Sequence, residues 1–131
     1  MSQLHMALEE RRRRDVRVDE VDGNGSGNEA AARQTQADCA KLAPKARFEI
    51  CQADISRADD RARLVQFCKD GFGRLDMLVN NAGINIRAPI HELTLEQFRS
   101  VLDTNLTGTW LMCRAAAEDM LAARWGRVIN I

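Results

Sequence analysis

The spacing of apolar and polar residues changes along the chain, and these changes predict where strands and helices lie. Residues 16–21 form a short β-branched run that ends among acidic residues and glycines. The helix-forming residues 29–42, followed by Pro44, predict a helix that ends before the proline. Residues 47–53 predict a second strand. The first third of the chain therefore alternates strand, helix and strand.

The middle of the chain continues this alternation. Ser56 and Asp59 have the spacing of a capping box, so we expect a helix to begin there. Gly71 or Gly73 is expected to end it, because glycine readily adopts the left-handed conformation of a helix terminus. The nearly all-apolar run 75–79 predicts a strand covered on both faces.

A second capping box, formed by residues 94–97, predicts the start of a long helix that ends at Gly126, before a last strand over residues 127–131. Strands and helices alternating at this spacing predict an α/β fold with a doubly wound parallel sheet, a layout shared by many chemistries. Helical spacing predicts the inner side of the long helix as Phe98, Val101, Leu102, Asn105, Thr109, Met112, Cys113 and Ala116.

Composition and charge narrow the class of protein. The 131 residues suit one domain, and 19 basic residues balance 19 acidic ones, so no net charge attracts nucleic acid or a membrane. The exception is the basic run 11–14, interpreted as a solvated tail, with RNA binding as an alternative. No apolar run reaches the roughly 20 residues that cross a bilayer, and no secretory signal is evident. Cytoplasmic localisation is expected.

The cysteines and histidines do not indicate a metal site. The four cysteines are far apart and include no C-x-x-C pair, which favours reduced thiols over a zinc site or a disulfide framework. His5 and His91 are isolated, so no metal is predicted.

Asparagines mark the most informative positions. Asn80 to Gly83 follow the predicted strand at its carboxyl end, where open α/β sheets bind ligands. The alternative is an ordinary turn that ends the strand. Asn105 falls on the predicted inner face of the long helix, where an unpaired amide would cost about 1–3 kcal/mol. It is expected either to bond structurally to the adjacent strand or to position a catalytic group or water.

Together these segments resemble the short-chain dehydrogenase/reductase family. The resemblance lies in Asp54-Ile55-Ser56, Asn80-Asn81-Ala82-Gly83, residues 103–108 (DTNLTG) and residues 126–131 (GRVINI), in family order and spacing. It implies that residues 15–131 form a partial NAD(P)-binding Rossmann domain, with residues 1–14 as a basic tail.

The resemblance also implies roles for individual residues. Asp54 would contact the adenine, and Ile55 would contribute backbone. The positions of Asn81, Ala82 and Gly83 line the adenosine-ribose and nicotinamide side of the cofactor in the family.

Two further roles follow from the resemblance. Asn105 matches the fourth member of the catalytic set, which anchors a water in a proton relay to the catalytic lysine. Glu20 resembles the acid that binds the adenosine ribose and favours NAD over NADP, although Asp19 and Asp22 compete for that role.

Two family features are missing from this sequence. No glycine-rich loop precedes Val16, and residues 23–27 (GNGSG) are the alternative loop, although acidic residues surround them. The chain contains no tyrosine, and the catalytic serine, tyrosine and lysine of the family have no counterpart. We therefore expect a partial Rossmann-type sheet without its first strand–loop–helix unit and its C-terminal part, and no dehydrogenase activity in the isolated chain. Unpaired apolar strand edges predict poor solubility or loose packing.

The implied function is hydride transfer between an alcohol and a ketone with NAD or NADP. Residues 85–90 are similar to gluconate and keto-sugar members of the family, and 3-oxoacyl carrier-protein reductases are close. The implied partners are a small-molecule substrate and further copies of the enzyme. The alternative is a non-catalytic interaction module that pairs through the helix over residues 94–124.

Overall fold

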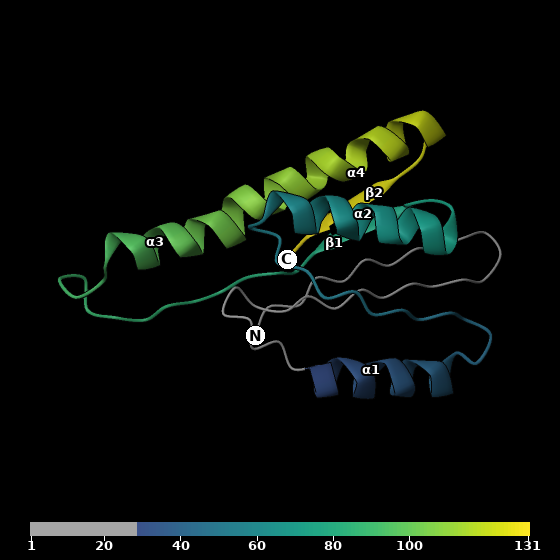
Figure 1. Ribbon diagram of the computed structural model, residues 1–131, viewed down its shortest axis with the longest axis horizontal. Coiled ribbons are helices and arrows are strands. Elements are labelled where there is room, and N and C mark those ends of the chain that lie inside the picture. Colours follow the sequence, from purple (N-terminus) through teal and green to yellow (C-terminus); the bar gives the residue numbers. More distant parts are fainter. Residues whose placement is uncertain (1–28) are drawn as a thin grey trace.

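The computed structural model describes residues 29–131 (Figure 1). Helix α1 spans Glu29–Leu42, as predicted, and places Glu29 in its first turn and Lys41 in its last. These charges complement the helix dipole. The predicted strand 16–21, the alternative glycine loop 23–27 and Glu20 lie outside the described residues.

Residues 47–53 run extended toward the core without forming a strand, so the prediction of a strand there was wrong. A strand requires a ladder of backbone hydrogen bonds, and within residues 29–131 the one described sheet does not include this segment. Among the described residues, side chains hold the segment. Gln36 Nε2 donates to the carbonyl of Phe48 at 2.5 Å, and Arg63 Nη2 donates to the carbonyl of Gln52 at 2.6 Å.

Helix α2 spans Ala58–Phe72, and its N-terminus differs from the prediction. Arg57 is the N-cap residue and makes no side-chain cap, because a guanidinium has no acceptor for a backbone N–H. The Ser56 hydroxyl donates to Asp54 Oδ1 at 2.7 Å. The capping box predicted at Ser56 was therefore wrong. The helix ends as predicted at Gly73, whose φ of 79° is left-handed.

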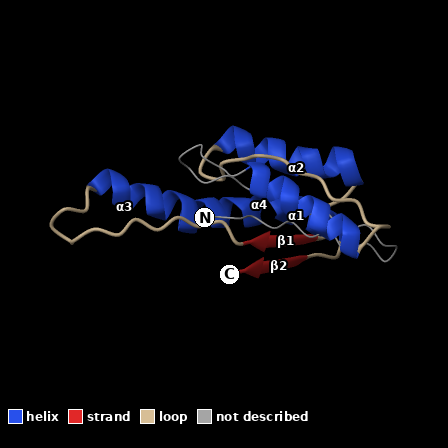
Figure 2. Ribbon diagram, turned by 90° about the horizontal axis from the view of Figure 1, so that it is seen from below, coloured by secondary structure: helices blue, strands red, loops and turns tan. Residues whose placement is uncertain are grey.

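Two parallel strands form the described sheet (Figure 2). Strand β1 spans Met77–Asn80 and strand β2 spans Arg127–Asn130, in a register that pairs Asn80 with Asn130. The strands predicted at residues 75–79 and 127–131 are thus confirmed, although β1 begins two residues later than the apolar run. The α/β fold with a parallel sheet is also confirmed.

The region predicted as one long helix has three parts. Helix α3 (Leu95–Leu102) begins at the predicted Thr94–Gln97 capping box, which is confirmed. A π-helical segment, η1 (Asp103–Gly108), follows, and helix α4 (Thr109–Ala123) completes the run. The run ends at Arg124, which adopts a left-handed φ of 52°, so the prediction that Gly126 ends it was wrong.

The π-helical segment explains why the predicted inner face was partly wrong. A π-turn takes more residues than an α-turn, so positions counted at α-helical spacing fall out of phase across it. Met112 and Ala116, which follow the segment, are buried as predicted, whereas Asn105 within it is exposed. Phe98 and Leu102 are exposed because they belong to α3, which buries no residue. The buried positions are Thr104, Gly108, Met112, Ala116 and Met120.

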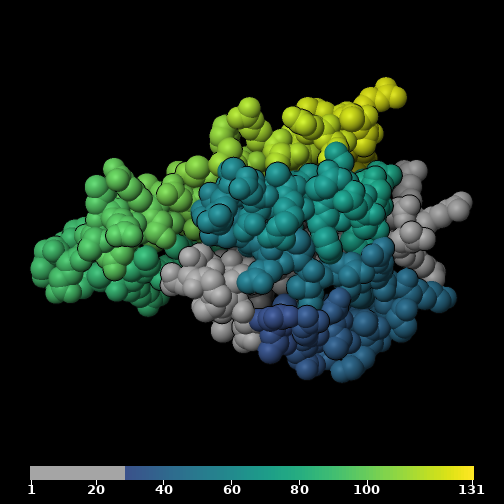
Figure 3. Space-filling view, viewed as in Figure 1, coloured from purple at the N-terminus to yellow at the C-terminus, as the bar shows by residue number. Residues whose placement is uncertain are grey.

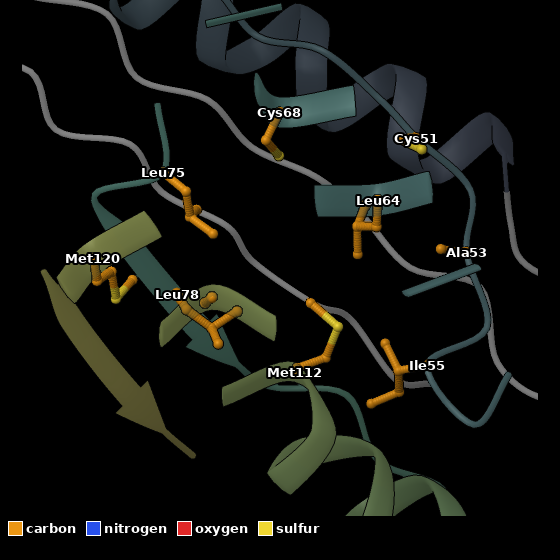
Figure 4. Close-up of a cluster of buried hydrophobic side chains, with 10 residues drawn as sticks. Cys51, Ala53, Ile55, Leu64, Cys68, Leu75, Leu78, Met112 and Met120 are labelled. Carbon is orange, nitrogen blue, oxygen red and sulfur yellow. The ribbon is translucent and has the colours of Figure 1, made fainter. Parts of the chain in front are cut away.

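Helix α4 organises the core. It packs against both strands and against α2, and Figure 4 shows the buried side chains that these elements share. By contrast, α3 buries no residue, and the space-filling view shows this green part of the chain projecting beyond α2 (Figure 3). Within the described residues, no helix is long and apolar enough to cross a membrane.

Candidate nucleotide site

The candidate site lies where the strands end. Asn81, Ala82 and Gly83 follow β1 directly and are half-buried. Because β1 and β2 are parallel and in register, both carboxyl ends meet at this edge of the sheet. Ligands of open α/β folds bind at such an edge. The three predicted residues therefore lie at an edge suited to a ligand.

Asn105 is bonded to the loop that follows β1. Its Oδ1 accepts from the backbone N–H of Ile84 at 2.8 Å, and its Nδ2 donates to the carbonyl of Ile84 at 2.9 Å. Both halves of the amide are thus paired with one residue, so the side chain fixes that loop. The prediction that Asn105 lies on a buried face was wrong, because the residue is exposed.

Gly83 also lies close to the side chain of Asn105. A Cβ atom on Gly83 would lie 3.4 Å from Asn105 Oδ1, at van der Waals contact with the amide. The hydroxyl of Thr109 donates to the carbonyl of Asn105 at 3.0 Å. Because η1 carries Asn105, this non-standard turn and the loop after β1 form one connected unit.

Asp54 and Ile55 belong to a turn that packs against η1 through the side chain of Ile55, next to Gly108. Asp54 Oδ1 accepts from the N–H and hydroxyl of Ser56 at 2.9 and 2.7 Å, which makes a tight turn. The backbone N–H of Asp54 donates to Asp60 Oδ2 at 2.9 Å. A hydrogen bond from Arg63 and that of Asp54 lower the pKa of Asp60, so its carboxylate stays ionised and anchors the turn.

A pocket of about 390 Å³ lies between Ser56 and the residues of α3 and η1. Ser56 lines it on one side, and Arg99, Ser100, Asp103 and Thr104 line it on the other. The pocket offers hydroxyl, guanidinium and carboxylate groups to a polar ligand. The ends of the candidate site are therefore Asp54 with Ser56, and Gly83 with Asn105, joined by η1.

Sequence reasoning missed a polar cluster between the strands. Asn80 Nδ2 donates to Asn130 Oδ1 at 2.9 Å and to Cys113 Sγ at 3.2 Å. Asn80 Oδ1 is buried and has no hydrogen-bond partner within the described part of the chain. The signal was present, since each strand ends in an asparagine and the two asparagines fall in register.

The cysteines form no disulfide bond within the described residues, and Cys51 and Cys68 are buried. Burial raises the pKa of Cys68 to about 12, which keeps its thiol protonated. Burial also raises the pKa of Cys51 despite the nearby Arg63. In residues 29–131, no three His, Cys, Asp or Glu side chains gather closely enough to hold a metal ion.

The parallel sheet and the helix α4 packed against it define an α/β protein, in which an asparagine on η1 bonds to the loop that follows the small residues after β1. Comparison with known proteins identifies the family. Residues 14–131 match the model of the short chain dehydrogenase family, and the chain belongs to that family.

Several curated relatives are similar. The chain is 41% identical over 80 residues to a 3-oxoacyl-[acyl-carrier-protein] reductase of Synechocystis sp., covering 61% of this chain and 32% of the relative. It is 35% identical over 116 residues to a D-threitol dehydrogenase of Mycolicibacterium smegmatis, covering 88% and 42%. A glucose 1-dehydrogenase 2 of Bacillus subtilis is 39% identical over 82 residues, covering 61% and 32%. The chain thus spans between a third and about two fifths of their length.

Proposed function

We propose that residues 15–131 form part of an NAD(P)-binding domain that serves hydride transfer between an alcohol and a ketone, with residues 1–14 as a basic tail. The observation that carries this proposal is the double hydrogen bond between Asn105 and Ile84. It fixes the backbone after Gly83 at the carboxyl edge of a parallel sheet. Family membership supports the assignment to oxidoreductases.

The residues present fit a dinucleotide. Asp54 uses Oδ1 for Ser56, and its Oδ2 is the carboxylate oxygen that would accept from the adenine amino group. Ala82 and Gly83 are small enough for the backbone to approach a flat ring. Asn81 and Ile55 would contribute backbone contacts, and Glu20 a carboxylate to the adenosine ribose. When bound, the nicotinamide would supply the hydride acceptor or donor.

In this proposal Asn105 is a positioning residue. Its amide is occupied by Ile84, so it acts by holding the loop beside Gly83. Proton transfer to the substrate oxygen would need a further acid or base. In the family a tyrosine has this role, and the chain contains no tyrosine. We therefore expect the 131-residue polypeptide to bind the dinucleotide without turning over substrate.

The names of the relatives support a proposal for the substrate class. Those names include a polyol dehydrogenase, a sugar dehydrogenase and a 3-oxoacyl carrier-protein reductase. We propose a small-molecule alcohol or ketone of one of these kinds, and NAD or NADP as cofactor.

Calorimetric titration with NAD⁺ and NADP⁺ tests the proposal. Wild-type chain is expected to bind one of them, and Asn105→Ala to bind it more weakly because Ile84 loses both hydrogen bonds. Asn85→Ala is the matched control, since Asn85 is an exposed asparagine in the same loop. NAD(P)H should not be consumed with keto-sugars or 3-oxoacyl thioesters. Absence of dinucleotide binding by wild type would refute the nucleotide site, and turnover would refute the inactive assignment.

A second candidate function is association through the α3–α4 run. Large apolar side chains recur there every four residues at the surface, and Leu106 and Trp110 are 65% and 59% exposed. That spacing places neighbours on one helical face. Exposed apolar surface of this kind indicates a protein–protein contact, so the run would pair with an equivalent helix of another family member.

Co-elution with a full-length relative tests this second candidate. Trp110→Ala is expected to abolish co-elution, because tryptophan contributes strongly to interfaces. Leu42→Ala is the control, since Leu42 is 87% exposed at the end of α1 and apart from the run. If both variants lose co-elution equally, or if neither variant loses it, the α3–α4 surface is not the site of association.

A further inference from the structure

Gly108 lies where η1 meets the turn that contains Asp54 and Ile55. A Cβ atom on Gly108 would lie 3.1 Å from both Cδ1 and Cγ1 of Ile55. It would also lie 3.0 Å from the carbonyl oxygen of Asp103. Carbon atoms in favourable contact lie about 3.5–4.0 Å apart, so a side chain on Gly108 would force a neighbour to move.

Ile55 has little space in which to move. It is fully buried and belongs to the core cluster with Leu64, Leu78 and Met112 (Figure 4). Close-packed interiors respond to an added methyl group by shifts of side chains and backbone. The backbone that would shift belongs to the Asp54–Ser56 turn, because Ile55 is its central residue.

The same glycine belongs to the segment that contacts the other end of the candidate site. η1 includes Asn105, whose amide holds Ile84 after Gly83. The contact between Gly108 and Ile55 therefore sets the separation between the Asp54 turn and η1. This separation also bounds the pocket that Ser56 and Thr104 line.

We propose that Gly108 is a positioning residue for the adenosine half of the bound nucleotide. Its lack of a side chain lets Ile55 pack against η1, and this packing places Asp54 and the backbone of Ile55 where they meet the adenine. The inference rests on the proposed nucleotide-binding function and names the residue that sets one part of that site.

Calorimetric titration with adenosine monophosphate tests the inference. Gly108→Ala is expected to weaken binding about tenfold, as overpacking displaces the turn. The number of binding sites per chain should stay unchanged, since a displaced site alters the dissociation constant, whereas partial unfolding lowers the number of competent chains. Gly71→Ala is the control, because its Cβ would make an ordinary contact 3.9 Å from Arg47 Nη2.

A compensating variant separates positioning from general damage. Ile55→Val removes Cδ1, which is one of the two Ile55 carbons that a Cβ on Gly108 would meet, and keeps Cγ1. It should weaken binding alone and restore it in part in Gly108→Ala. Because Ile55→Val removes only a methyl group, it is expected to fold. Its binding of adenosine monophosphate can therefore be measured even if Gly108→Ala does not fold.

Three results would overturn the inference. They are unchanged binding by both single variants, a loss of binding sites without a change in dissociation constant, and a double variant weaker than either single one. A wild-type chain that binds no adenosine monophosphate would instead refute the proposed nucleotide site itself, which distinguishes the two failures.

Discussion

At the scale of single residues, the polar side chains around the candidate site bond mainly to backbone. Asn105 bonds to Ile84, Asp54 to the N–H of Ser56, and Asp60 to the N–H of Asp54. Such bonds fix loops that lie outside the ladders of helices and strands. The shape of the site therefore depends on a few side chains, and each of them can be tested by substitution.

The Asp60 carboxylate gives a pH-dependent test of this arrangement. Arg63 and the N–H of Asp54 lower the pKa of Asp60 in the folded state. Asp60 therefore stabilises the fold above the unfolded-state pKa of about 3.9, and this contribution is lost as the pH falls through the lowered folded-state pKa. Asp60→Asn should lower the urea midpoint at pH 7, and its difference from wild type should shrink in acid.

Asp59→Asn is the control for Asp60, because Asp59 shares the first turn of α2 and is exposed. Both variants remove a charge from the same helix N-terminus. Equal effects of the two variants at every pH would show that the bonds to Arg63 and Asp54 add no stability.

At the scale of elements, the π-helical segment η1 separates two helices of different character. Helix α4 contributes Met112, Ala116 and Met120 to the core, whereas α3 contributes no buried residue. Helices are stabilised largely by packing of an apolar face. Helix α3 therefore depends on its cap more than α4 does.

Removal of that cap should loosen α3 locally. Thr94 Oγ1 accepts from the N–H of Gln97 at 3.1 Å, and Gln97 Oε1 accepts from the N–H of Thr94 at 2.9 Å. Loss of a threonine cap costs about 1 kcal/mol, so Thr94→Ala should speed amide hydrogen exchange at Gln97 and Phe98 about fivefold. Ser100→Ala, an exposed hydroxyl within α3, should not. Equally faster exchange in α4 would contradict a local effect, because it would show that the whole fold is destabilised.

At the scale of the whole molecule, the sheet is small and partly exposed. All four residues of β2 are exposed, and Val128 and Ile129 are 44% and 40% accessible. Within residues 29–131, β2 pairs on one side with β1 and lies at an edge of the sheet. Exposed apolar strand edges template pairing with other chains, so self-association is expected.

A charge on β2 should reduce this association. Ile129→Lys is expected to raise the monomer fraction in sedimentation experiments, because charged side chains on edge strands oppose pairing. Ala122→Lys adds the same charge to the exposed surface of α4 and serves as the control. A fully monomeric wild-type chain with sharp thermal unfolding would contradict the prediction.

The sequence by itself determined the order of elements and the family. Helix α1, the Thr94 capping box, the Gly73 terminus and both strands followed from local patterns. These features depend on residues close in the chain, so propensity and capping suffice to predict them. Asn81, Ala82, Gly83, Asp54, Ile55 and Asn105 were selected by motif, and their roles stay predictions.

Tertiary structure alone decided the rest, because it depends on contacts between distant residues. The extended segment 47–53 is no strand, since no described strand pairs with it. The π-helical turn at 103–108 rotated the inner face of the long helix away from its expected phase. The partner of Asn105 was Ile84, 21 residues away, and the neighbour of Gly108 was Ile55. No local pattern encodes either pair.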